Sequence, residues 1–191
     1  MKNLIILSAP SGAGKTTICR ELQKKRPELK FSVSCTTRPQ RHYERDGYDY
    51  TFVTEEEFSK IKGDNGFIEF ENVHGYWYGT PRSTIETVLK NNEILLLDVD
   101  VKGGVSIMET YPENSFSIFI SPPSKEELVR RLQSRGSDTM DHIKKRLKRM
   151  DMEMEYENKF DCVIINEEIE NTVNQVIQTI EYQMEEITDG N

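Results

Sequence analysis

The chain has 191 residues, of which 33 are acidic and 25 basic, so its formal net charge is −8, and 36% of its residues are hydrophobic. This length is typical of one compact domain that needs neither disulfides nor a structural metal, and the three cysteines lack any Cys-x-x-Cys spacing, as expected for a reducing compartment. A net acidic chain is a poor generic nucleic-acid binder, and no apolar run approaches the roughly 20 residues of a membrane span.

Short apolar runs alternate with amphipathic segments along the chain. Each run is too short for a helix, and most are rich in Ile, Leu, Val or Phe, which is typical of buried strands. The predicted strands are Asn3–Leu7, Phe31–Ser34, Glu93–Asp98, Phe116–Ile120 and Cys162–Ile165. The predicted helices are Lys15–Arg26, Lys125–Arg135, about Met140 to Glu157, and Ile169–Ile187. Strands that alternate with helices predict an α/β fold with a mainly parallel sheet covered on both faces.

The first predicted strand leads into a glycine-rich loop, Ala9-Pro10-Ser11-Gly12-Ala13-Gly14-Lys15-Thr16-Thr17. This loop matches the phosphate-loop pattern G-x-x-x-x-G-K-[ST], except that Ala9 replaces the first glycine. Gly12 and Gly14 let the backbone wrap a phosphate with its N–H groups. Lys15 can then reach the β- and γ-phosphates, and the Thr16 hydroxyl can bind Mg²⁺. A glycine-rich turn without a ligand is the alternative, but Gly-Lys-Thr between a strand and a helix favours nucleotide binding.

Between about Arg38 and Pro81 the pattern changes, because aromatic residues alternate with polar ones. Such alternation is typical of half-exposed antiparallel strands. These predicted strands are Tyr48–Phe52, Phe67–Glu71 and Tyr76–Tyr78. We interpret them as an insertion that shapes a binding face. A second irregular segment, Gly136–Asp141, is polar and contains glycine, and we interpret it as part of a mobile lid.

Arg38 and Arg41 follow the second predicted strand, where two guanidinium groups could clamp a second phosphate. Taken alone, they are better interpreted as a solvated basic loop. The insertion shifts this balance, because Tyr50 and Tyr78 supply phenol donors and Glu69 supplies an acid at an inward position.

Asp98 and Asp100 end an apolar strand, so they stand at the carboxyl edge of the sheet, where ligands of open α/β folds collect. Two acids there suit a hydrated Mg²⁺ and an acceptor base. A plain turn at the end of a strand is the alternative.

A set of segments spread along nearly the whole chain carries a family resemblance. The segments are Ser8–Lys15, Ser32–Arg38, Asp46–Tyr50, Phe67–Phe70, Tyr78–Pro81, Leu97–Asp100, Arg130–Gly136 and Val163–Asn166. In this order they resemble the guanylate kinase family. The departures are Ala9, where the family usually has glycine, and Lys102-Gly103, where it more often has Gln-Gly. Neither departure removes a group that the chemistry needs.

The resemblance implies a three-layer P-loop kinase fold with a central mainly parallel sheet, a small antiparallel GMP-binding insertion and a helical lid. Within a single domain, 1–191, the expected core is about 1–34, 82–124 and 158–191, the insertion about 35–81 and the lid about 125–157. The implied reaction is Mg²⁺-dependent transfer of the γ-phosphoryl group of ATP to GMP, and to dGMP, giving ADP and GDP in purine nucleotide metabolism. A cytoplasmic protein without a nucleic-acid, membrane or obligate protein partner is also implied.

The resemblance assigns site residues as well. The ATP-binding residues are the loop Ala9 to Thr17, Arg135, and Asn166 beside the donor adenine. The GMP-binding residues are Ser34, Arg38, Arg41, Tyr50, Glu69, Tyr78, Thr80, Asp98, Asp100 and Arg146. Of these, the residues that hold the GMP phosphate are Arg38, Arg41, Tyr50 and Tyr78, and those that read the guanine are Ser34, Glu69, Thr80 and Asp100. The catalytic residues are Lys15, Arg38, Arg131, Arg135 and Arg146, and the magnesium ligands are Thr16 and, through water, Asp98.

The implied roles agree with elementary chemistry. Guanine presents N1–H and N2–H₂ as adjacent donors that the Glu69 carboxylate can accept, whereas adenine would leave a buried acid unsatisfied; a solvated strand carboxylate is the alternative. Arg131 and Arg135 share one helix face, but by spacing alone they are as often surface ion-pair partners. The attacking GMP phosphate oxygen is already ionised, so catalysis requires alignment and charge stabilisation rather than a protein nucleophile or a strong base.

Two other functions fit parts of the pattern. A guanylate-kinase-like interaction domain would bind a protein segment with the GMP-site arginines, but the intact phosphate loop, Asp98 and the lid arginines argue against it. A kinase for another nucleoside monophosphate is the nearer alternative, and Glu69 together with Ser34 and Asp100 argues against that one.

Overall fold

The computed structural model describes residues 2–73, 75–134 and 140–188, and the side chains of 131–146 and 184–188 lie outside the described set. The helices in these ranges are α1 (Lys15–Lys25), α2 (Glu55–Gly63), α3 (Arg82–Lys90), α4 (Val101–Thr110), α5 (Lys125–Ser134), α6 (Met140–Met154), the 3₁₀ turn η1 (Glu157–Lys159) and α7 (Ile169–Thr188). None of these described helices combines the length and the apolar character that a bilayer-spanning helix needs.

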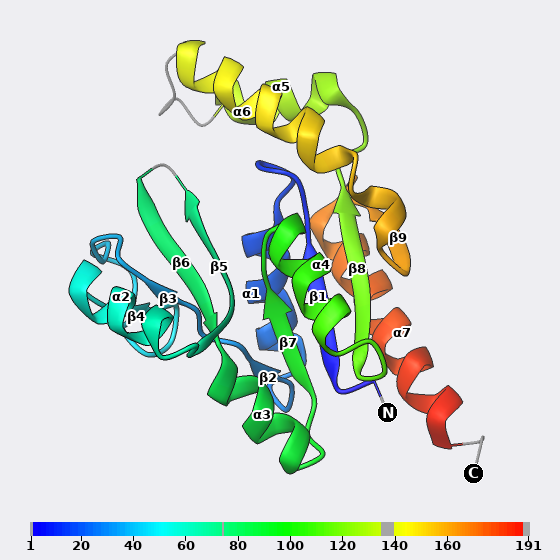
Figure 1. Cartoon of the computed structure of the whole chain (residues 1–191). Coiled ribbons are helices and arrows are strands. Elements are labelled where there is room, and N and C mark those ends of the chain that lie inside the picture. The colour runs from blue at the N-terminus through cyan, green and yellow to red at the C-terminus, as the bar shows by residue number, and fades with distance from the viewer. Residues whose placement is uncertain (1, 74, 135–139, 189–191) are drawn as a thin grey trace.

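Five parallel strands form the central sheet (Figure 1). They are β1 (Leu4–Ser8), β2 (Lys30–Phe31), β7 (Leu95–Asp98), β8 (Ser115–Ser121) and β9 (Cys162–Ile165). Their order across the sheet is β2-β7-β1-β8-β9, so β1 is central, and Ile5 pairs with Leu96 on one side and Phe116 on the other. The predicted α/β fold with a mainly parallel sheet is confirmed.

The side chains of β1 alternate between the two faces of the sheet, and helices cover both faces. On one face, Ile5 and Leu7 pack with buried residues of α1 and α7. On the other face, Leu4 and Ile6 pack with buried residues of α3 and α4. All four side chains are fully buried, which explains why β1 is a continuous apolar run rather than an alternating one.

A second, smaller sheet forms the insertion. Its strands are β3 (Cys35–Thr36), β4 (Thr51–Phe52), β5 (Phe67–Val73) and β6 (Tyr76–Pro81), in the order β4-β3-β6-β5. The β5–β6 and β3–β6 pairs are antiparallel, as predicted. The prediction was wrong for Tyr48–Phe52, because only its last two residues form a strand and β4 runs parallel to β3. The connection over residues 37–50 is long enough for the crossover that a parallel pair needs.

Helix α2 completes the insertion, although the predicted strands did not include it. The Thr54 hydroxyl accepts from the Glu57 N–H at 3.2 Å, and the Glu57 carboxylate accepts from the Thr54 N–H at 2.8 Å, which makes a capping box. Phe58 of α2 is buried and stacks with Phe67 and Trp77 at ring-centroid distances of 4.5 and 6.0 Å. The insertion therefore has a small hydrophobic core of its own and can present a defined surface to the rest of the domain.

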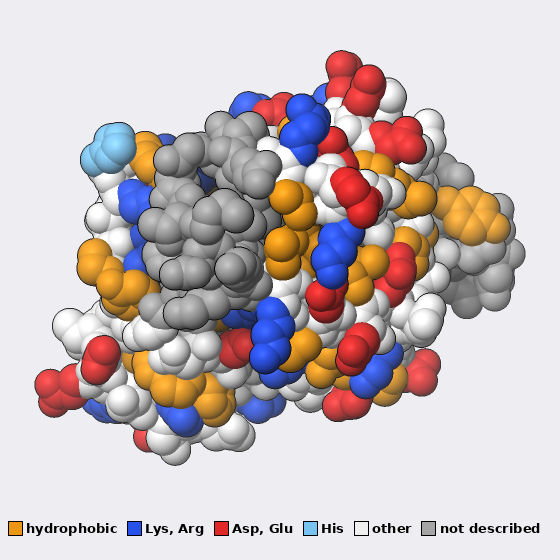
Figure 2. Space-filling view, turned by 90° about the horizontal axis from the view of Figure 1, so that it is seen from above, with side chains coloured by type: hydrophobic (Ala, Val, Ile, Leu, Met, Phe, Trp, Pro, Cys, Tyr) orange, Lys and Arg blue, Asp and Glu red, His pale blue; other side chains and the backbone are white. Residues whose placement is uncertain are grey.

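Helices α5 and α6 occupy the segment predicted as the lid, and they lie beyond the carboxyl end of β8 (Figure 1). Buried Leu128 and Met150 pack these two helices together. Figure 2 shows the molecule from this end, and among the side chains that the structure describes there, basic and acidic ones are interspersed.

Candidate active site

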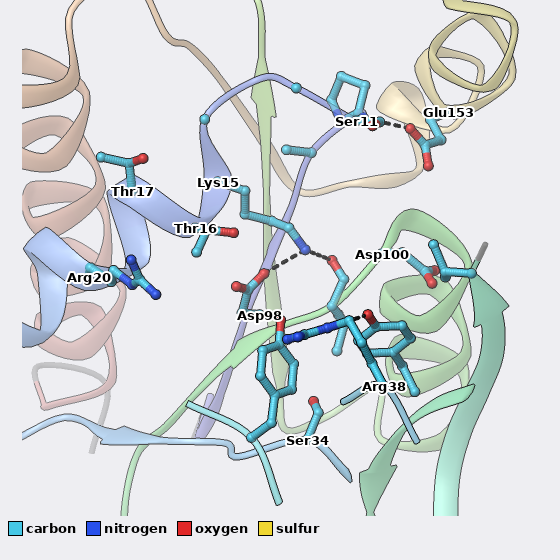
Figure 3. A pocket seen from close by; sticks show the side chains of 18 of the residues that line it. Ser11, Lys15, Thr16, Thr17, Arg20, Ser34, Arg38, Asp98, Asp100 and Glu153 are labelled. Carbon is cyan, nitrogen blue, oxygen red and sulfur yellow. Dashed lines mark hydrogen bonds and ion pairs between the residues drawn. The ribbon is translucent and has the colours of Figure 1, made fainter. Parts of the chain in front are cut away.

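A cavity of about 540 Å³ opens at the carboxyl ends of β1 and β7 (Figure 3). Its lining comes from the loop after β1, the insertion, the turn after β7 and α6. The basic residues of this lining are Lys15, Arg20, Arg38, Arg41 and Arg149, and the acidic ones are Glu44, Glu69, Asp98, Asp100 and Glu153. Because the two kinds are balanced, the binding of an anion depends on how each cation is paired and where the backbone N–H groups point.

The loop between β1 and α1 has the backbone shape that the phosphate-loop motif predicts. Gly12 and Gly14 have φ angles of 94° and 98°, in the left-handed region that residues with a Cβ rarely adopt. Gly14 precedes α1 and offers no side-chain cap, so the first N–H groups of the helix remain for a ligand. Ala9 is buried and is not among the residues with positive φ, so alanine replaces the first glycine without backbone strain.

Lys15 is already held in place at the floor of the cavity. Its ammonium lies 2.5 Å from Asp98 Oδ1 and donates to the Val99 carbonyl oxygen at 2.5 Å. Burial acts to lower the pKa of Lys15, but Asp98 outweighs it and the pKa lies above its ordinary value, so the side chain stays charged. Thr16 and Asp98 together offer one hydroxyl and one carboxylate, a donor set that suits Mg²⁺ shared with water and phosphate oxygens.

Arg38 is oriented by a buried carboxylate that the sequence analysis did not single out. Glu44 accepts from both terminal nitrogens of Arg38, at 2.7 and 3.1 Å, and from the Arg41 backbone N–H at 2.8 Å. Burial acts to raise the pKa of Glu44, but these hydrogen bonds outweigh it and lower the pKa. The Arg38 Nε donates to the Tyr78 hydroxyl at 3.2 Å. Burial raises the pKa of Tyr50 to about 12, so its phenol also stays protonated and can donate.

Glu69 on β5 lies between the insertion and α4. Its Oε1 accepts from the Thr80 hydroxyl at 2.5 Å, and a Cβ on Gly103 would lie 2.8 Å from its Oε2. Burial raises the pKa of Glu69 to about 7. Asp100 caps α4 by accepting from the N–H groups of Lys102 and Gly103, at 2.9 and 2.8 Å. A carboxyl buried in this way suits a ligand that brings N–H donors of its own.

The guanylate kinase family model matches residues 1–183 of the chain. The chain belongs to the guanylate kinase family. A curated guanylate kinase from Fusobacterium nucleatum is 47% identical over 179 residues, which cover 93% of this chain and 95% of that protein. A second, from Chlorobaculum tepidum, is 42% identical and covers 93% of this chain and 91% of that protein. The crystal structure of guanylate kinase from Anaplasma phagocytophilum has a TM-score of 0.76 at 32% identity, covering 94% of this chain and 85% of that one.

In this member of the guanylate kinase family, one cavity collects most of the predicted site residues. Those that line it are Ala9, Pro10, Ser11, Gly12, Gly14, Lys15, Thr16, Thr17, Ser34, Arg38, Arg41, Tyr50, Glu69, Tyr78, Asp98 and Asp100. Ala13 and Thr80 are fully buried, and Thr80 acts on the cavity through its hydrogen bond to Glu69. The side chains of Arg131, Arg135 and Arg146 lie outside the described residues, so their roles stay predictions.

Asn166 supports the phosphate loop from beneath. The side chain is buried, its Nδ2 donates to the Ala13 carbonyl oxygen at 2.6 Å, and its Oδ1 accepts from the Thr172 hydroxyl at 3.0 Å. A Cβ on Gly14 would lie 2.7 Å from Asn166 Nδ2. Glycine at position 14 is therefore required for space as well as for its φ angle. The predicted contact of Asn166 with the donor adenine stays a prediction.

Three more charged residues around the cavity were missed by the sequence analysis. They are Glu71 on β5 and Arg149 and Glu153 on α6. Arg149 contacts both carboxylates, and Glu153 accepts from the Ser11 N–H of the phosphate loop at 2.7 Å (Figure 3). The sequence pattern that could have drawn attention to Arg149 and Glu153 is their i,i+4 spacing, but this spacing is common on exposed helices and does not indicate a functional site.

Proposed function

We propose that the protein transfers the γ-phosphoryl group of ATP to GMP, and to dGMP, with Mg²⁺, giving ADP and GDP as a cytoplasmic step of purine nucleotide metabolism. The observation that carries the proposal is a single cavity with a phosphate loop at one end and a second set of anion-binding and base-binding groups at the other. Such a cavity can hold two nucleotides with their phosphates facing each other. Membership of the guanylate kinase family supports GMP as the acceptor.

At the donor end, the N–H groups of the phosphate loop and of the first turn of α1 would bind the β- and γ-phosphates. Lys15 would contribute a positive charge that its contacts with Asp98 and Val99 already position. Thr16 and, through water, Asp98 would hold Mg²⁺, which when bound supplies charge neutralisation to these phosphates. The hydrogen bond from Asn166 to the loop supports the same preorganisation.

At the acceptor end, Arg38 and Arg41 would hold the GMP phosphate together with the phenols of Tyr50 and Tyr78. Glu44 orients the Arg38 guanidinium before any ligand arrives, so less side-chain freedom is lost on binding. The N–H and O–H groups of these four residues that are not already hydrogen-bonded would then contact the phosphate, which planar guanidinium ions bind well.

The guanine would be read by Glu69, with Thr80, Ser34 and Asp100 around it. The ionised Glu69 carboxylate accepts two hydrogen bonds and therefore matches the N1–H and N2–H₂ donors of guanine. Because burial raises the pKa of Glu69 to about 7, Glu69 would bind guanine best above this pH, where it has lost its proton. Adenine would place an acceptor against this carboxylate and is disfavoured.

An oxygen of the acceptor phosphate would attack the γ-phosphorus in line, and this oxygen is already ionised at neutral pH. The residues of this chain therefore align the two nucleotides and stabilise the charge that spreads over the transferring group. Lys15 and Arg38 face that group, and we propose that Arg131, Arg135 and Arg146 join them when α5 and α6 close over the cavity. Closure would also exclude water, which otherwise hydrolyses ATP.

Incubation of the protein with ATP, Mg²⁺ and GMP, followed by chromatographic separation of the nucleotides, tests the proposal. We expect ADP and GDP in equal amounts, and neither product after chelation of Mg²⁺ or with Lys15→Ala. ADP without GDP would indicate hydrolysis instead of transfer. Absence of both products from folded wild-type protein would contradict the proposal.

A further inference from the structure

Three charged side chains link the phosphate loop, α6 and the insertion, and we name Glu153, Arg149 and Glu71 the lid relay. Glu153 on α6 accepts from the Ser11 N–H at 2.7 Å through Oε2, and its Oε1 accepts from Arg149 Nε at 2.6 Å. Arg149 Nη2 donates to Glu71 Oε2 on β5 at 3.0 Å. The relay therefore joins the loop at the donor end to a strand of the insertion at the acceptor end; Figure 3 shows its contact between Glu153 and Ser11.

Glu153 places a negative charge beside a loop that has to receive phosphates. Its side chain is only 8% exposed, so water screens this charge weakly. The Ser11 N–H that it occupies belongs to the loop whose N–H groups bind anions, and a carboxylate without a counter-charge there would repel a polyanionic donor. Among the residues that the structure describes, Arg149 supplies the positive charge in direct contact with the Glu153 carboxylate.

Arg149 interacts more strongly with Glu153 than with Glu71. Burial raises the pKa of Glu71 to about 7, and the neighbouring Asp100 carboxyl adds to this effect against Arg149 and Lys102. Arg149 lies closer to Glu153, at 2.6 Å, than to Glu71, at 3.0 Å, and Glu153 is also the more deeply buried of the two carboxylates. The positive charge of Arg149 is thus directed mainly at Glu153, while its contact with Glu71 fixes the direction of the guanidinium.

We propose that Arg149 is a positioning residue for the donor nucleotide: it holds Glu153 against the Ser11 N–H and cancels the charge of that carboxylate. The phosphate loop then keeps its shape through the Glu153 contact and still accepts an anionic donor. This inference rests on the proposed function in taking ATP as the donor. Arg149 acts through Glu153, and it does not need to touch the phosphates.

Removal of both partners distinguishes this role from a direct contact between Arg149 and the phosphates. Arg149→Met leaves the Glu153 charge beside the loop without its partner, and donor binding weakens. Glu153→Gln retains an acceptor oxygen for Ser11 but has no charge. The double variant therefore restores donor binding if Arg149 serves to neutralise Glu153, and it stays weak if Arg149 binds the donor itself.

The experiment measures the Kd of a non-hydrolysable ATP analogue by calorimetry, and kcat and the ATP KM at saturating GMP, for the full chain and each variant. We expect Arg149→Met to raise the Kd and the KM about tenfold, as for the loss of one poorly screened counter-charge, with kcat changed less than about threefold. Glu153→Gln and the double variant should bind within about threefold of wild type. Arg130→Met removes an exposed lid arginine paired with Glu127 and serves as the matched control, which should bind as wild type does.

A double variant as weak as Arg149→Met would overturn the proposal, and so would an Arg149→Met protein that binds the analogue as tightly as wild type. If Arg149→Met does not fold, Arg149→Lys replaces it: retained charge should keep the Kd within about threefold of wild type, and a loss of about tenfold or more would contradict neutralisation. Wild-type protein that binds the analogue but transfers nothing to GMP would contradict the proposed function, and the same binding constants would still decide the role of Arg149.

Discussion

Glu69→Gln tests directly whether a carboxylate reads the guanine. The structure holds this side chain from two sides, by the Thr80 hydroxyl at Oε1 and by the α4 backbone at Gly103 beside Oε2. Gln offers one acceptor in place of two and turns an NH₂ group toward a guanine donor. A lost charge-assisted hydrogen bond costs ~1.5–3 kcal/mol and an unsatisfied donor ~1–3 kcal/mol more, so kcat/KM for GMP should fall roughly 10²- to 10⁴-fold.

The same substitution should stabilise the empty protein at high pH. Burial raises the pKa of Glu69 from its ordinary 4.5 to about 7, so the folded state holds the proton more tightly than the unfolded chain does. The contribution of Glu69 to stability is therefore fully present below about pH 4.5 and is lost as pH rises through about 7. At about pH 8 the buried carboxylate destabilises the fold by on the order of 3 kcal/mol, which Gln removes.

Three measurements check this reasoning. ADP production with GMP varied at saturating Mg-ATP gives kcat/KM, calorimetry gives the affinity for an ATP analogue, and urea unfolding at about pH 5 and pH 8 gives the stability difference. Glu86→Gln, on the exposed face of α3, is the matched control. A Glu69→Gln protein that keeps its kcat/KM for GMP, or that loses ATP-analogue affinity to the same extent, would refute the role of Glu69 in reading guanine. The affinity of the wild-type protein for GMP should also decrease as the pH is lowered below about 7. An affinity that does not change with pH would contradict a requirement for the ionised carboxylate.

Four further predictions concern other residues of the cavity and of the elements that support it. Lys15→Met should lower transfer at least about 10³-fold with an unchanged circular dichroism spectrum, and a smaller loss would contradict its role at the phosphates. Glu44→Gln should raise the GMP KM about tenfold, because Arg38 loses a bidentate partner, and steady-state kinetics with an unchanged KM would refute this. Asn166→Ala should lower the free energy of unfolding by ~1–3 kcal/mol in urea titrations, because the Ala13 carbonyl loses its partner. The fluorescence of Trp77, the sole tryptophan, which stacks with Phe58 in the core of the insertion and precedes the cavity residue Tyr78, should respond to GMP but not to AMP, and equal responses would contradict guanine selectivity at the acceptor end.

Elements with complete local signals could be predicted close to their observed bounds, as for α1 between the glycine loop and Pro27. Helix α4 was not among the predicted helices, because it contains Gly103 and Gly104, which weaken the helical signal. The structure shows why they are glycines: a Cβ on Gly103 would meet Glu69 at 2.8 Å, and one on Gly104 would meet Phe160 at 3.2 Å. These are tertiary requirements that no local pattern displays. The capping box of α2 was a readable signal that the strand interpretation of the insertion overlooked.

The residues of the candidate site also differ in whether the sequence alone could predict them. The phosphate loop was predictable because its residues are contiguous and each has a physical role at its position. Glu44 was missed because a carboxylate near two arginines in a loop is also what a solvated surface contains, and its burial depends on the insertion folding around it. Glu71 and Arg149 lie far apart in the sequence and meet only when α6 lies against the insertion. Contacts between residues so far apart in the sequence can be identified only from the folded structure.

As in other members of the guanylate kinase family, this cavity transfers phosphate from ATP to a guanine nucleotide. The measurement that tests it most directly is ADP production from Mg-ATP with GMP, dGMP, AMP, CMP, UMP and dTMP offered separately, with Lys15→Ala as the blank. We expect ADP with GMP and dGMP alone, and none in the blank. Comparable ADP with another acceptor, or no ADP with any acceptor from folded protein that binds GMP, would contradict it.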